Sequence, residues 1–419
     1  MPICPHCGQT HKTGSRFCTR TGTLLPSPAV CPHCFNDLSR AGPNALFCPF
    51  CGLELWEAGA WPMEKGNPAR LSSSLEPVVF PLRKVWVFPD GGTGVGEICS
   101  SPVVWGETLY IGSADRSVYA LNKRTGKPRW NRPTKGAVTA SPLVATGAVL
   151  VPSTDGRLYA LAPETGVLRW AFPGEGALAP LHASPLLCRG TLVLATGDGR
   201  VIGLEGKSGT LLWEFPEKGS VGTLTGAPAF SAGQVLVASE GKYVFSLALE
   251  TGKLLWRFPR RRAARARFRG GPVCFKGRVY IADRSGKVYS LALKTGEDRW
   301  MDAVEVEGTV ESSPAVGFGR LFLGTGAEYL YALDLQTGGI LWRERNPGLP
   351  VLDAITASPL LAANQRIVTA SCGGYITIRD FEGTELWKTR LESEIRAAPV
   401  LSDGYLFAVC KGRVYGFHR

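Results

Sequence analysis

The sequence predicts an all-β fold, an eight-bladed β-propeller of four-stranded antiparallel blades. Three features of its 419 residues lead to this prediction: eight tryptophans at near-constant spacing, eight prolines in step with them, and short apolar runs between Gly-containing turns. Consecutive tryptophans are 40 to 45 residues apart, which is the length of one such blade. The tryptophans are Trp86, Trp130, Trp170, Trp213, Trp256, Trp300, Trp342 and Trp387.

Each period repeats one order of strands and turns. In the first, an apolar run begins at Pro102, the runs LYIGS and VYALN follow, and the last run ends with Trp130. Thr-Gly or Ser-Gly stands before the tryptophan run in six periods, whereas the seventh departs with Phe-Glu-Gly-Thr at 381–384. The runs are almost continuously apolar because neighbouring blades cover both faces of each sheet. The prolines that mark the innermost strands are Pro102, Pro142, Pro185, Pro228, Pro272, Pro314, Pro359 and Pro399.

The two series are out of phase, and this predicts how the ring closes. Trp86 precedes the first of these prolines, and three apolar runs without a tryptophan follow the last one. We therefore expect residues 84–88 to supply the outer strand of the last blade. The first and last blades then share a sheet, and no strand edge is left bare between them.

Residues 27–56 are predicted to form a small zinc ribbon. Two Cys-x-x-Cys pairs lie 13 residues apart, the spacing of a four-cysteine zinc site. Zinc binding supplies folding free energy that so short a segment cannot obtain from an apolar core. With four protein ligands the metal has no open position for water, which favours a structural site. The predicted ligands are Cys31, Cys34, Cys48 and Cys51.

Residues 1–26 repeat this pattern imperfectly, because Thr21 stands where a fourth cysteine is expected. The nearby candidates for the missing ligand are His6 and His11. We favour His11, since His33 occupies the place of His6 in a site that already has four cysteines. The alternative is a degenerate ribbon that binds no metal. Both units resemble bacterial zinc ribbons, which implies binding of proteins or nucleic acids rather than catalysis. The first set of predicted ligands is Cys4, Cys7, His11 and Cys18.

Composition divides the rest of the chain in two. Residues 57–79 are rich in Gly, Pro and Ser and are predicted to be a linker, and residues 80–419 are predicted to be the propeller. Five cysteines are scattered singly through the repeats, and we expect them to be small buried core residues. Because no signal-peptide pattern precedes the first cysteine pair and many thiols are unpaired, we expect a reducing, cytoplasmic location. These cysteines are Cys99, Cys188, Cys274, Cys372 and Cys410.

The net charge of +12 is concentrated in one segment, where seven arginines fall within 13 residues that contain no acid. We expect this segment to add a positive patch to one face of the ring and to dock an acidic protein surface. An anionic membrane or nucleic acid is the alternative partner, and a solvated loop that binds nothing specific is the other interpretation. The arginines are Arg257, Arg260, Arg261, Arg262, Arg265, Arg267 and Arg269.

The repeats YALNKRTGKPRW, YALAPETGVLRW and YALDLQTGGILW resemble the PQQ-type, or quinoprotein-like, propeller repeats, and this resemblance covers roughly residues 83 to 419. It implies that each tryptophan docks flat between neighbouring blades. It also leaves two classes of function: quinone-dependent alcohol or sugar dehydrogenases, and the non-catalytic propeller lipoprotein of the outer-membrane barrel assembly machinery.

We expect the second kind of function: a non-catalytic scaffold that binds a protein partner as a monomeric ring, with zinc and without PQQ. The chain has no adjacent-cysteine pair and no carboxylate cluster suited to calcium and quinone. His182, just before an innermost strand, is expected at the channel mouth in a structural role. The alternatives are a PQQ-dependent oxidoreductase-like enzyme, or a nucleic-acid-binding adaptor that uses the ribbons and the arginine-rich segment.

Overall fold

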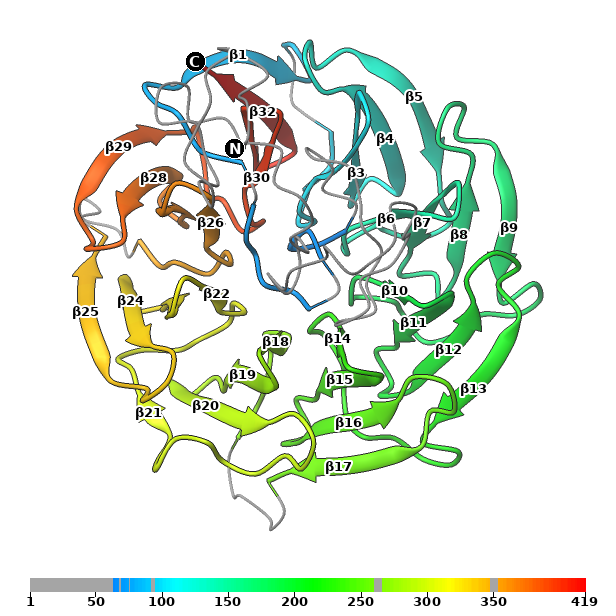
Figure 1. Ribbon diagram of the computed structural model, residues 1–419. Coiled ribbons are helices and arrows are strands. Elements are labelled where there is room, and N and C mark those ends of the chain that lie inside the picture. Colours follow the sequence, from blue (N-terminus) through cyan, green and yellow to red (C-terminus); the bar gives the residue numbers. More distant parts are fainter. Residues whose placement is uncertain (1–62, 68, 75, 92–94, 260–265, 347–352) are drawn as a thin grey trace, which may run out of the picture.

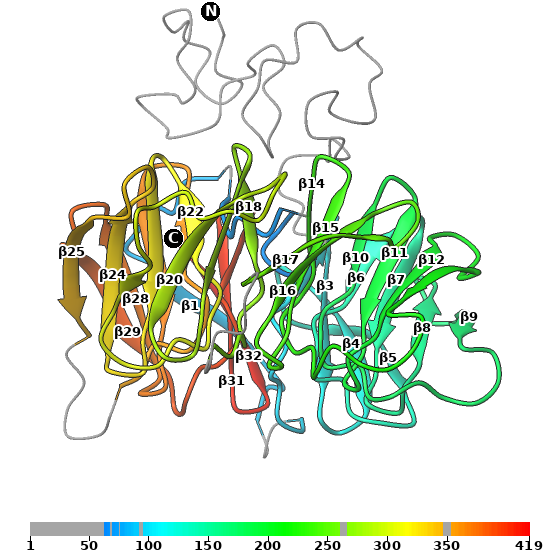
Figure 2. The same cartoon turned by 90° about the horizontal axis from the view of Figure 1, so that it is seen from below.

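The computed structural model describes residues 63–67, 69–74, 76–91, 95–259, 266–346 and 353–419. In these residues the strands form eight four-stranded antiparallel sheets around one axis (Figure 1). The sheets stand side by side, with strands that run between the two faces of the ring (Figure 2). The predicted fold class, an all-β propeller of eight blades, is confirmed. Within the described ranges, no helix has the length and apolar character needed to span a membrane.

The strands of the first four blades follow chain order from the channel outward. They are β2 (Val103–Trp105), β3 (Thr108–Ser113), β4 (Ser117–Asn122) and β5 (Pro128–Pro133); β6 (Leu143–Ala145), β7 (Ala148–Pro152), β8 (Leu158–Leu161) and β9 (Leu168–Phe172); β10 (Leu186–Cys188), β11 (Thr191–Ala195), β12 (Val201–Glu205) and β13 (Leu211–Phe215); β14 (Ala229–Ser231), β15 (Gln234–Ala238), β16 (Val244–Ala248) and β17 (Leu254–Phe258).

Blades five to seven follow the same order, and the eighth takes its outer strand from the start of the propeller. They are β18 (Val273–Phe275), β19 (Arg278–Ala282), β20 (Lys287–Ala292) and β21 (Val304–Glu305); β22 (Ala315–Gly317), β23 (Arg320–Gly324), β24 (Tyr329–Asp334) and β25 (Ile340–Arg345); β26 (Leu360–Ala362), β27 (Arg366–Ala370), β28 (Tyr375–Asp380) and β29 (Glu385–Arg390); β30 (Val400–Ser402), β31 (Tyr405–Cys410), β32 (Arg413–His418) and β1 (Arg83–Phe88).

The ring closes by strand exchange, as predicted. Strand β1 pairs antiparallel with β32, so that Trp86 faces Gly416 and Val87 faces Tyr415. The sheet order is β1-β32-β31-β30, and the carboxyl end of the chain lies beside β1 (Figure 1). The last blade therefore joins both ends of the propeller sequence in one sheet.

The tryptophans dock between blades, as the resemblance implies. The Trp86 indole donates a hydrogen bond to the Lys123 carbonyl of the next blade at 3.1 Å, and Trp130, Trp213, Trp256 and Trp342 donate in the same way. Each ring lies on the glycine of the neighbouring turn: a Cβ on Gly126 would lie 2.5 Å from Trp86 Cε3. Gly126 also has a φ of +69°, so this turn requires glycine both for its conformation and for its space.

The departure from the repeat at residues 381–384 is not accompanied by an irregular seventh blade. Its outer strand β29 pairs with β28 over its length, and Gly383, with a φ of +94°, makes the turn that Thr-Gly makes elsewhere. The shortened outer strand belongs instead to the fifth blade, where β21 spans two residues beyond Trp300. A different turn sequence thus preserves the blade geometry.

The crossings between blades and the turns between second and third strands lie on the same face, which we call the crossing face. Thr134 of the first crossing donates its N–H to the Arg116 carbonyl at 2.7 Å, and Val138 donates to Ser113 O at 3.0 Å. The acidic residues of these turns are structural, because Asp115 and Asp155 accept hydrogen bonds from the tyrosine four positions later in their own blade, at 2.7 Å and 2.6 Å.

Candidate functional site

Residues 63–78 lie in the central channel of the propeller, and we call them the channel segment (Figure 1). The side chains of Met63, Lys65, Arg70, Leu71 and Ser72 are each exposed by no more than 2%. Composition predicts a linker over 57–79, but the described residues from 63 onward are packed inside the ring. Their abundance of small side chains is explained by the narrowness of the channel rather than by solvation.

The channel segment pairs in turn with the inner strands of three consecutive blades. Ala69 O accepts a hydrogen bond from Cys274 N at 3.0 Å, and Leu71 O accepts one from Val316 N at 3.1 Å. Leu361 then bonds to the segment twice, by donating to Ser72 O at 2.8 Å and by accepting from Ser74 N at 2.7 Å. The segment therefore satisfies backbone groups that the innermost strands β18, β22 and β26 would otherwise present to the channel.

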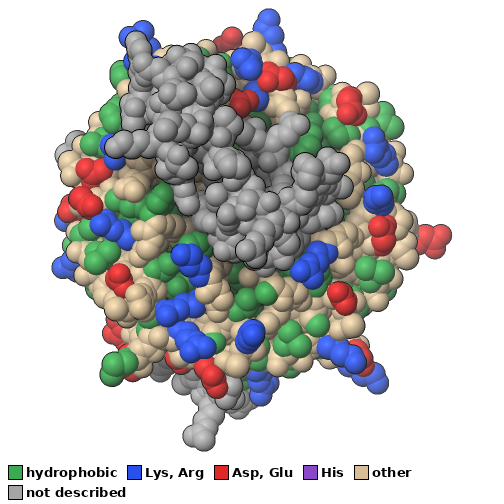
Figure 3. Space-filling view, viewed as in Figure 1, with side chains coloured by type: hydrophobic (Ala, Val, Ile, Leu, Met, Phe, Trp, Pro, Cys, Tyr) green, Lys and Arg blue, Asp and Glu red, His purple; other side chains and the backbone are tan. Residues whose placement is uncertain are grey.

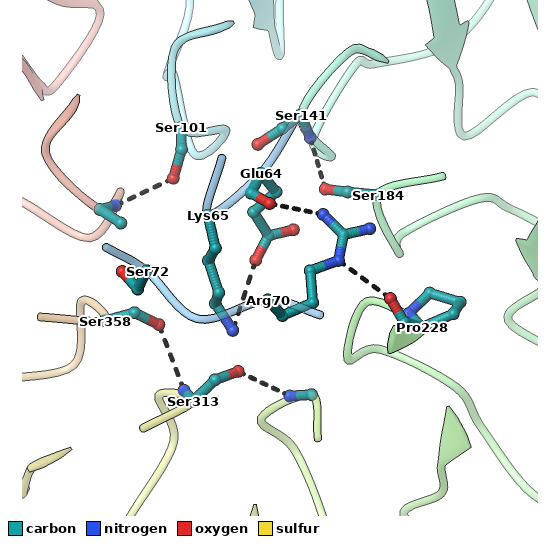
Figure 4. Close-up of polar contacts among 12 residues, drawn as sticks. Glu64, Lys65, Arg70, Ser72, Ser101, Ser141, Ser184, Pro228, Ser313 and Ser358 are labelled. Atoms are coloured by element: carbon teal, nitrogen blue, oxygen red, sulfur yellow. Dashed lines mark hydrogen bonds and ion pairs between the residues drawn. The ribbon is translucent and has the colours of Figure 1, made fainter. Parts of the chain in front are cut away.

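Arg70 connects the segment to the opposite side of the channel (Figure 4). Its Nε donates to Pro228 O and its Nη2 to Pro185 O, each at 2.9 Å, while Nη1 donates to Glu64 O at 2.6 Å. These prolines begin the inner strands of the third and fourth blades. A fully buried guanidinium thus ties one end of the segment to two blades that its backbone does not pair with.

Three charged groups of the segment are buried together. Lys65 Nζ lies 3.9 Å from Glu64 Oε1. Burial lowers the pKa of Lys65 to about 8, with Glu64 raising it and Arg70 lowering it further. Burial acts to raise the pKa of Glu64, but the charges of Lys65 and Arg70 and a hydrogen bond from Ser184 outweigh it, so that the pKa is lowered and the carboxylate is held ionised. Sequence reasoning missed this cluster, since no motif or periodicity marks it.

A ring of serine hydroxyls surrounds the cluster (Figure 4). Each of these serines directly precedes an inner-strand proline, and its hydroxyl accepts an N–H from the equivalent position of the preceding blade. The bonds are Ala398 N to Ser101 Oγ at 3.0 Å, Ser141 N to Ser184 Oγ at 2.9 Å, Gly271 N to Ser313 Oγ at 2.8 Å, and Ser313 N to Ser358 Oγ at 3.2 Å. The Ser-Pro pairs of the repeat therefore join blade to blade around the channel.

A polar cavity of about 200 Å³ lies at this end of the channel, and Glu64 belongs to its lining. Its outer rim, the mouth ring, consists of the eight residues that stand three positions before the inner-strand prolines. Counting back from each proline would have identified these residues in the sequence. The mouth ring is Cys99, Thr139, His182, Thr225, Arg269, Glu311, Thr356 and Arg396.

The charges of the mouth ring are paired with one another or with close neighbours. Arg269 Nη1 lies 3.0 Å from Glu311 Oε1, and Arg396 Nη2 lies 3.0 Å from Glu394 Oε2. His182 is at the mouth, as expected, and its Nδ1 lies 3.3 Å from Thr139 Oγ1. Burial, followed by the charge of Glu97, raises the pKa of the Cys99 thiol to about 11, so the thiol is protonated at neutral pH. The mouth thus has no activated nucleophile–base pair among its described residues.

The arginine-rich segment is divided in its described part. Arg257 lies on β17, with its guanidinium 5.1 Å from the Tyr243 ring centre, and Arg267 is exposed. Arg269 turns into the mouth ring, where Glu311 and, at 3.8 Å, Glu240 balance its charge. The structure therefore brings Arg269 to the cavity and keeps Arg257 on the outer strand. The remaining predicted residues, Arg260, Arg261, Arg262 and Arg265, lie outside the described residues.

The cysteines fall into three groups. Cys188, Cys274 and Cys410 are buried, as predicted, whereas Cys99 and Cys372 are half-buried, because they lie near the rim of the channel rather than within a sheet. All eight predicted zinc ligands lie outside the described residues: Cys4, Cys7, His11, Cys18, Cys31, Cys34, Cys48 and Cys51.

The described channel does not fit a quinone cofactor such as PQQ, which is planar, aromatic and carries three carboxylates. No Phe, Tyr or Trp lines the cavity, and its two arginines already face carboxylates. The volume is below the roughly 300 Å³ at which small-molecule pockets begin. Across the described ranges, no group of three or more His, Cys, Asp or Glu is placed to hold a metal ion.

Comparisons with known proteins agree with this architecture. A family model described as outer membrane protein assembly factor BamB matches residues 52–247 and 240–381. No curated protein matches the sequence. Among solved structures, BamB from Moraxella catarrhalis is 18% identical, with a TM-score of 0.64 over 81% of this chain and 98% of that one. The computationally designed Ika8 protein is 18% identical, with a TM-score of 0.66 over 83% and 100%.

A europium-containing methanol dehydrogenase is 15% identical, with a TM-score of 0.69 over 87% of this chain and 98% of that one. At these identities the three structures show a shared fold and no shared activity. The family model, in contrast, covers more than half of the sequence. The chain therefore belongs to the PQQ-type propeller family that is described by the outer membrane protein assembly factor BamB.

Proposed function

We propose that the protein is a non-catalytic binding protein whose propeller is a rigid platform for a protein partner. The observation that carries this proposal is the channel segment, whose buried residues occupy the centre of the ring. What remains of the channel is a small polar cavity rimmed by paired charges. The exposed faces and rim of the ring are then the surfaces available for recognition.

The proposed partner surface is the crossing face, and the proposed partner is an acidic protein. The arginine-rich crossing between the fourth and fifth blades emerges there, and Arg267 is exposed within its described part. The opposite face, drawn in Figure 3, shows Lys and Arg interspersed with Asp and Glu, so neither sign dominates its described surface. Charge complementarity with an acidic partner would speed and orient association.

The amino-terminal part adds two proposed zinc ribbons, which would contribute a second binding element. The channel segment begins at Met63, directly after the predicted ribbons, and would fix their point of attachment to the ring. Metal analysis of the full chain tests the ribbons: we expect two zinc ions per chain, and one fewer in a Cys48→Ser variant. One zinc per chain would support the degenerate form of the first ribbon, and no zinc would refute both sites.

The proposed location is cytoplasmic. The five described cysteines are free thiols, which suits a reducing compartment. Fractionation of cells that express the untagged chain, with alkylation to count reduced thiols, tests this. Recovery of the protein in an oxidising compartment would contradict it.

Affinity capture from native extract tests the binding function, with three forms of the full chain as bait. The first is unaltered, the second has all seven arginines of the segment changed to serine, and the third has Cys31 and Cys48 changed to serine. We expect the first to retain a partner that the second loses. A partner lost with the third form alone would assign recognition to the ribbons. Quinone-dependent dehydrogenase activity after incubation with PQQ and calcium would refute the non-catalytic proposal.

A further inference from the structure

We propose that the channel holds a small monovalent anion, a halide or a compact carboxylate such as formate, bound by the Lys65 ammonium and the surrounding serine hydroxyls. This inference is independent of the partner-binding function. It rests on an unpartnered charge, a charge imbalance and a set of unused donors around one cavity.

The unpartnered charge is the Lys65 ammonium. Its Nζ is buried and makes no hydrogen bond, although an ammonium has three N–H groups to donate. The neighbouring carboxylate oxygen, Glu64 Oε1, is 3.9 Å away, which is too far for a hydrogen bond. A buried charge without hydrogen bonds is among the most unfavourable arrangements in a protein interior. An anion in contact with Nζ would remove this penalty.

The charge imbalance comes from the composition of the buried cluster. Glu64 contributes one negative charge, and Lys65 and Arg70 contribute two positive charges, so the cluster carries a net charge of +1. The three hydrogen bonds of Arg70 all go to neutral carbonyl oxygens, which orient the guanidinium but leave its charge uncompensated. One monovalent anion would neutralise the cluster.

The unused donors are hydroxyl groups. Ser101, Ser313 and Ser358 each accept a backbone N–H through Oγ, which leaves the hydroxyl hydrogen free to donate to a ligand. Ser312 Oγ is buried and has no hydrogen-bond partner. All four serines line the cavity, and the Lys65 side chain extends toward the side of the ring that holds Ser313 and Ser358 (Figure 4).

The cavity has room for such a ligand. Its volume of about 200 Å³ exceeds the roughly 30 Å³ that one water molecule occupies in the liquid, and a halide or formate is of comparable size to one or two waters. Its lining lacks the aromatic surface and free arginine pairs that a larger organic anion would need. The lowered pKa of Lys65 is consistent with an ammonium that lacks its counter-ion.

Crystals of the full chain grown with sodium bromide test the site directly through the anomalous signal of bromine. We expect an ordered bromide within 3.5 Å of Lys65 Nζ, at the upper limit of a hydrogen-bond distance of roughly this size. Sodium formate added in excess is expected to displace it. Absence of an anomalous peak in the channel would overturn the proposal, and a bromide that formate cannot displace would overturn its carboxylate part.

Variants make the assignment specific. In a Lys65→Met chain the bromide peak should vanish, whereas Lys253→Met, which changes an exposed lysine on a turn, should leave it unchanged. In solution, the excess line width of chloride in ³⁵Cl NMR should fall to the protein-free value with Lys65→Met and persist with Lys253→Met. A peak or an excess line width that survives the loss of Lys65 would place the anion elsewhere and refute the site.

Discussion

Replacing Arg70 by methionine should destabilise the propeller strongly, because this side chain connects the channel segment to two blades. The change removes three hydrogen bonds, of 2.9, 2.9 and 2.6 Å, and leaves the carbonyls of Pro228, Pro185 and Glu64 without that donor. It also removes one of two cations that face the buried Glu64 carboxylate. Loss of one partner in such a buried charge network costs about 3–5 kcal/mol, against total stabilities of about 5–15 kcal/mol.

Urea unfolding measured by tryptophan fluorescence is the appropriate assay, since the docked indoles report the separation of blades. Linear extrapolation gives the change in the free energy of unfolding. Arg129→Met is a matched control, because Arg129 is exposed on the outer strand β5 and its loss should cost less than about 0.5 kcal/mol. A loss below about 1 kcal/mol for Arg70→Met would refute the view that the segment is an integral part of the ring.

Three further predictions concern the ring and its centre. Gly296→Ala should cost more than Gly277→Ala by about 1–3 kcal/mol in urea unfolding: both have φ near +70°, but a Cβ at Gly296 would lie 2.5 Å from the Trp256 ring, whereas nothing lies within 4 Å at Gly277; equal losses would contradict interblade docking. Deletion of residues 80–90 removes β1 and should lower the melting temperature of the whole ring or abolish folding; an unchanged melting temperature would contradict closure by strand exchange. Lys65→Met should raise stability at pH 7 and low salt by about 1–3 kcal/mol. The folded pKa of about 8 lies below the unfolded value of 10.5, so the unfolded chain binds more protons between these pH values and the unaltered protein gains stability as pH rises through this window. The advantage of the variant should therefore shrink from pH 8 to 10.5, and an advantage independent of pH would contradict the assigned burial.

The ring was predictable from the sequence because each blade repeats the same local chemistry. The tryptophan spacing, the positive-φ glycine of the turn and the inner-strand proline all recur within one period, and all three have the expected place in the structure. Closure by β1 also followed, since Trp86 and the incomplete last period are complementary. Single buried cysteines such as Cys274 were predictable from the general preference of free cysteine for the interior.

The channel segment was not predictable by these means, because its contacts connect residues far apart in sequence. Ser72 bonds to the carbonyl of Pro359, 287 positions away, and Arg70 bonds to that of Pro228, 158 positions away. A stretch of Gly, Pro and Ser has no amphipathic period, so composition alone favours a solvated linker. Its burial follows only from the geometry of a closed ring whose inner strands present unpaired backbone groups.

The pairing of charges at the mouth was likewise hidden from the sequence. The arginine-rich segment reads as an unbalanced positive run, yet Arg269 lies among carboxylates contributed by Glu240 and Glu311 from neighbouring blades. Sequence neighbours of opposite charge are absent there, and the balance comes from the ring arrangement. A test of charge-driven binding should therefore weigh Arg267, which is exposed, above Arg269.

Amide hydrogen exchange over residues 63–78, measured by mass spectrometry on the full chain, tests the central claim that the protein fills its own channel. We predict protection comparable to that of inner strands such as β18 and β22, because Ser74 donates its amide to Leu361 O and the segment as a whole is buried. Complete exchange of this peptide within seconds, at the rate of an unstructured linker, would contradict the claim.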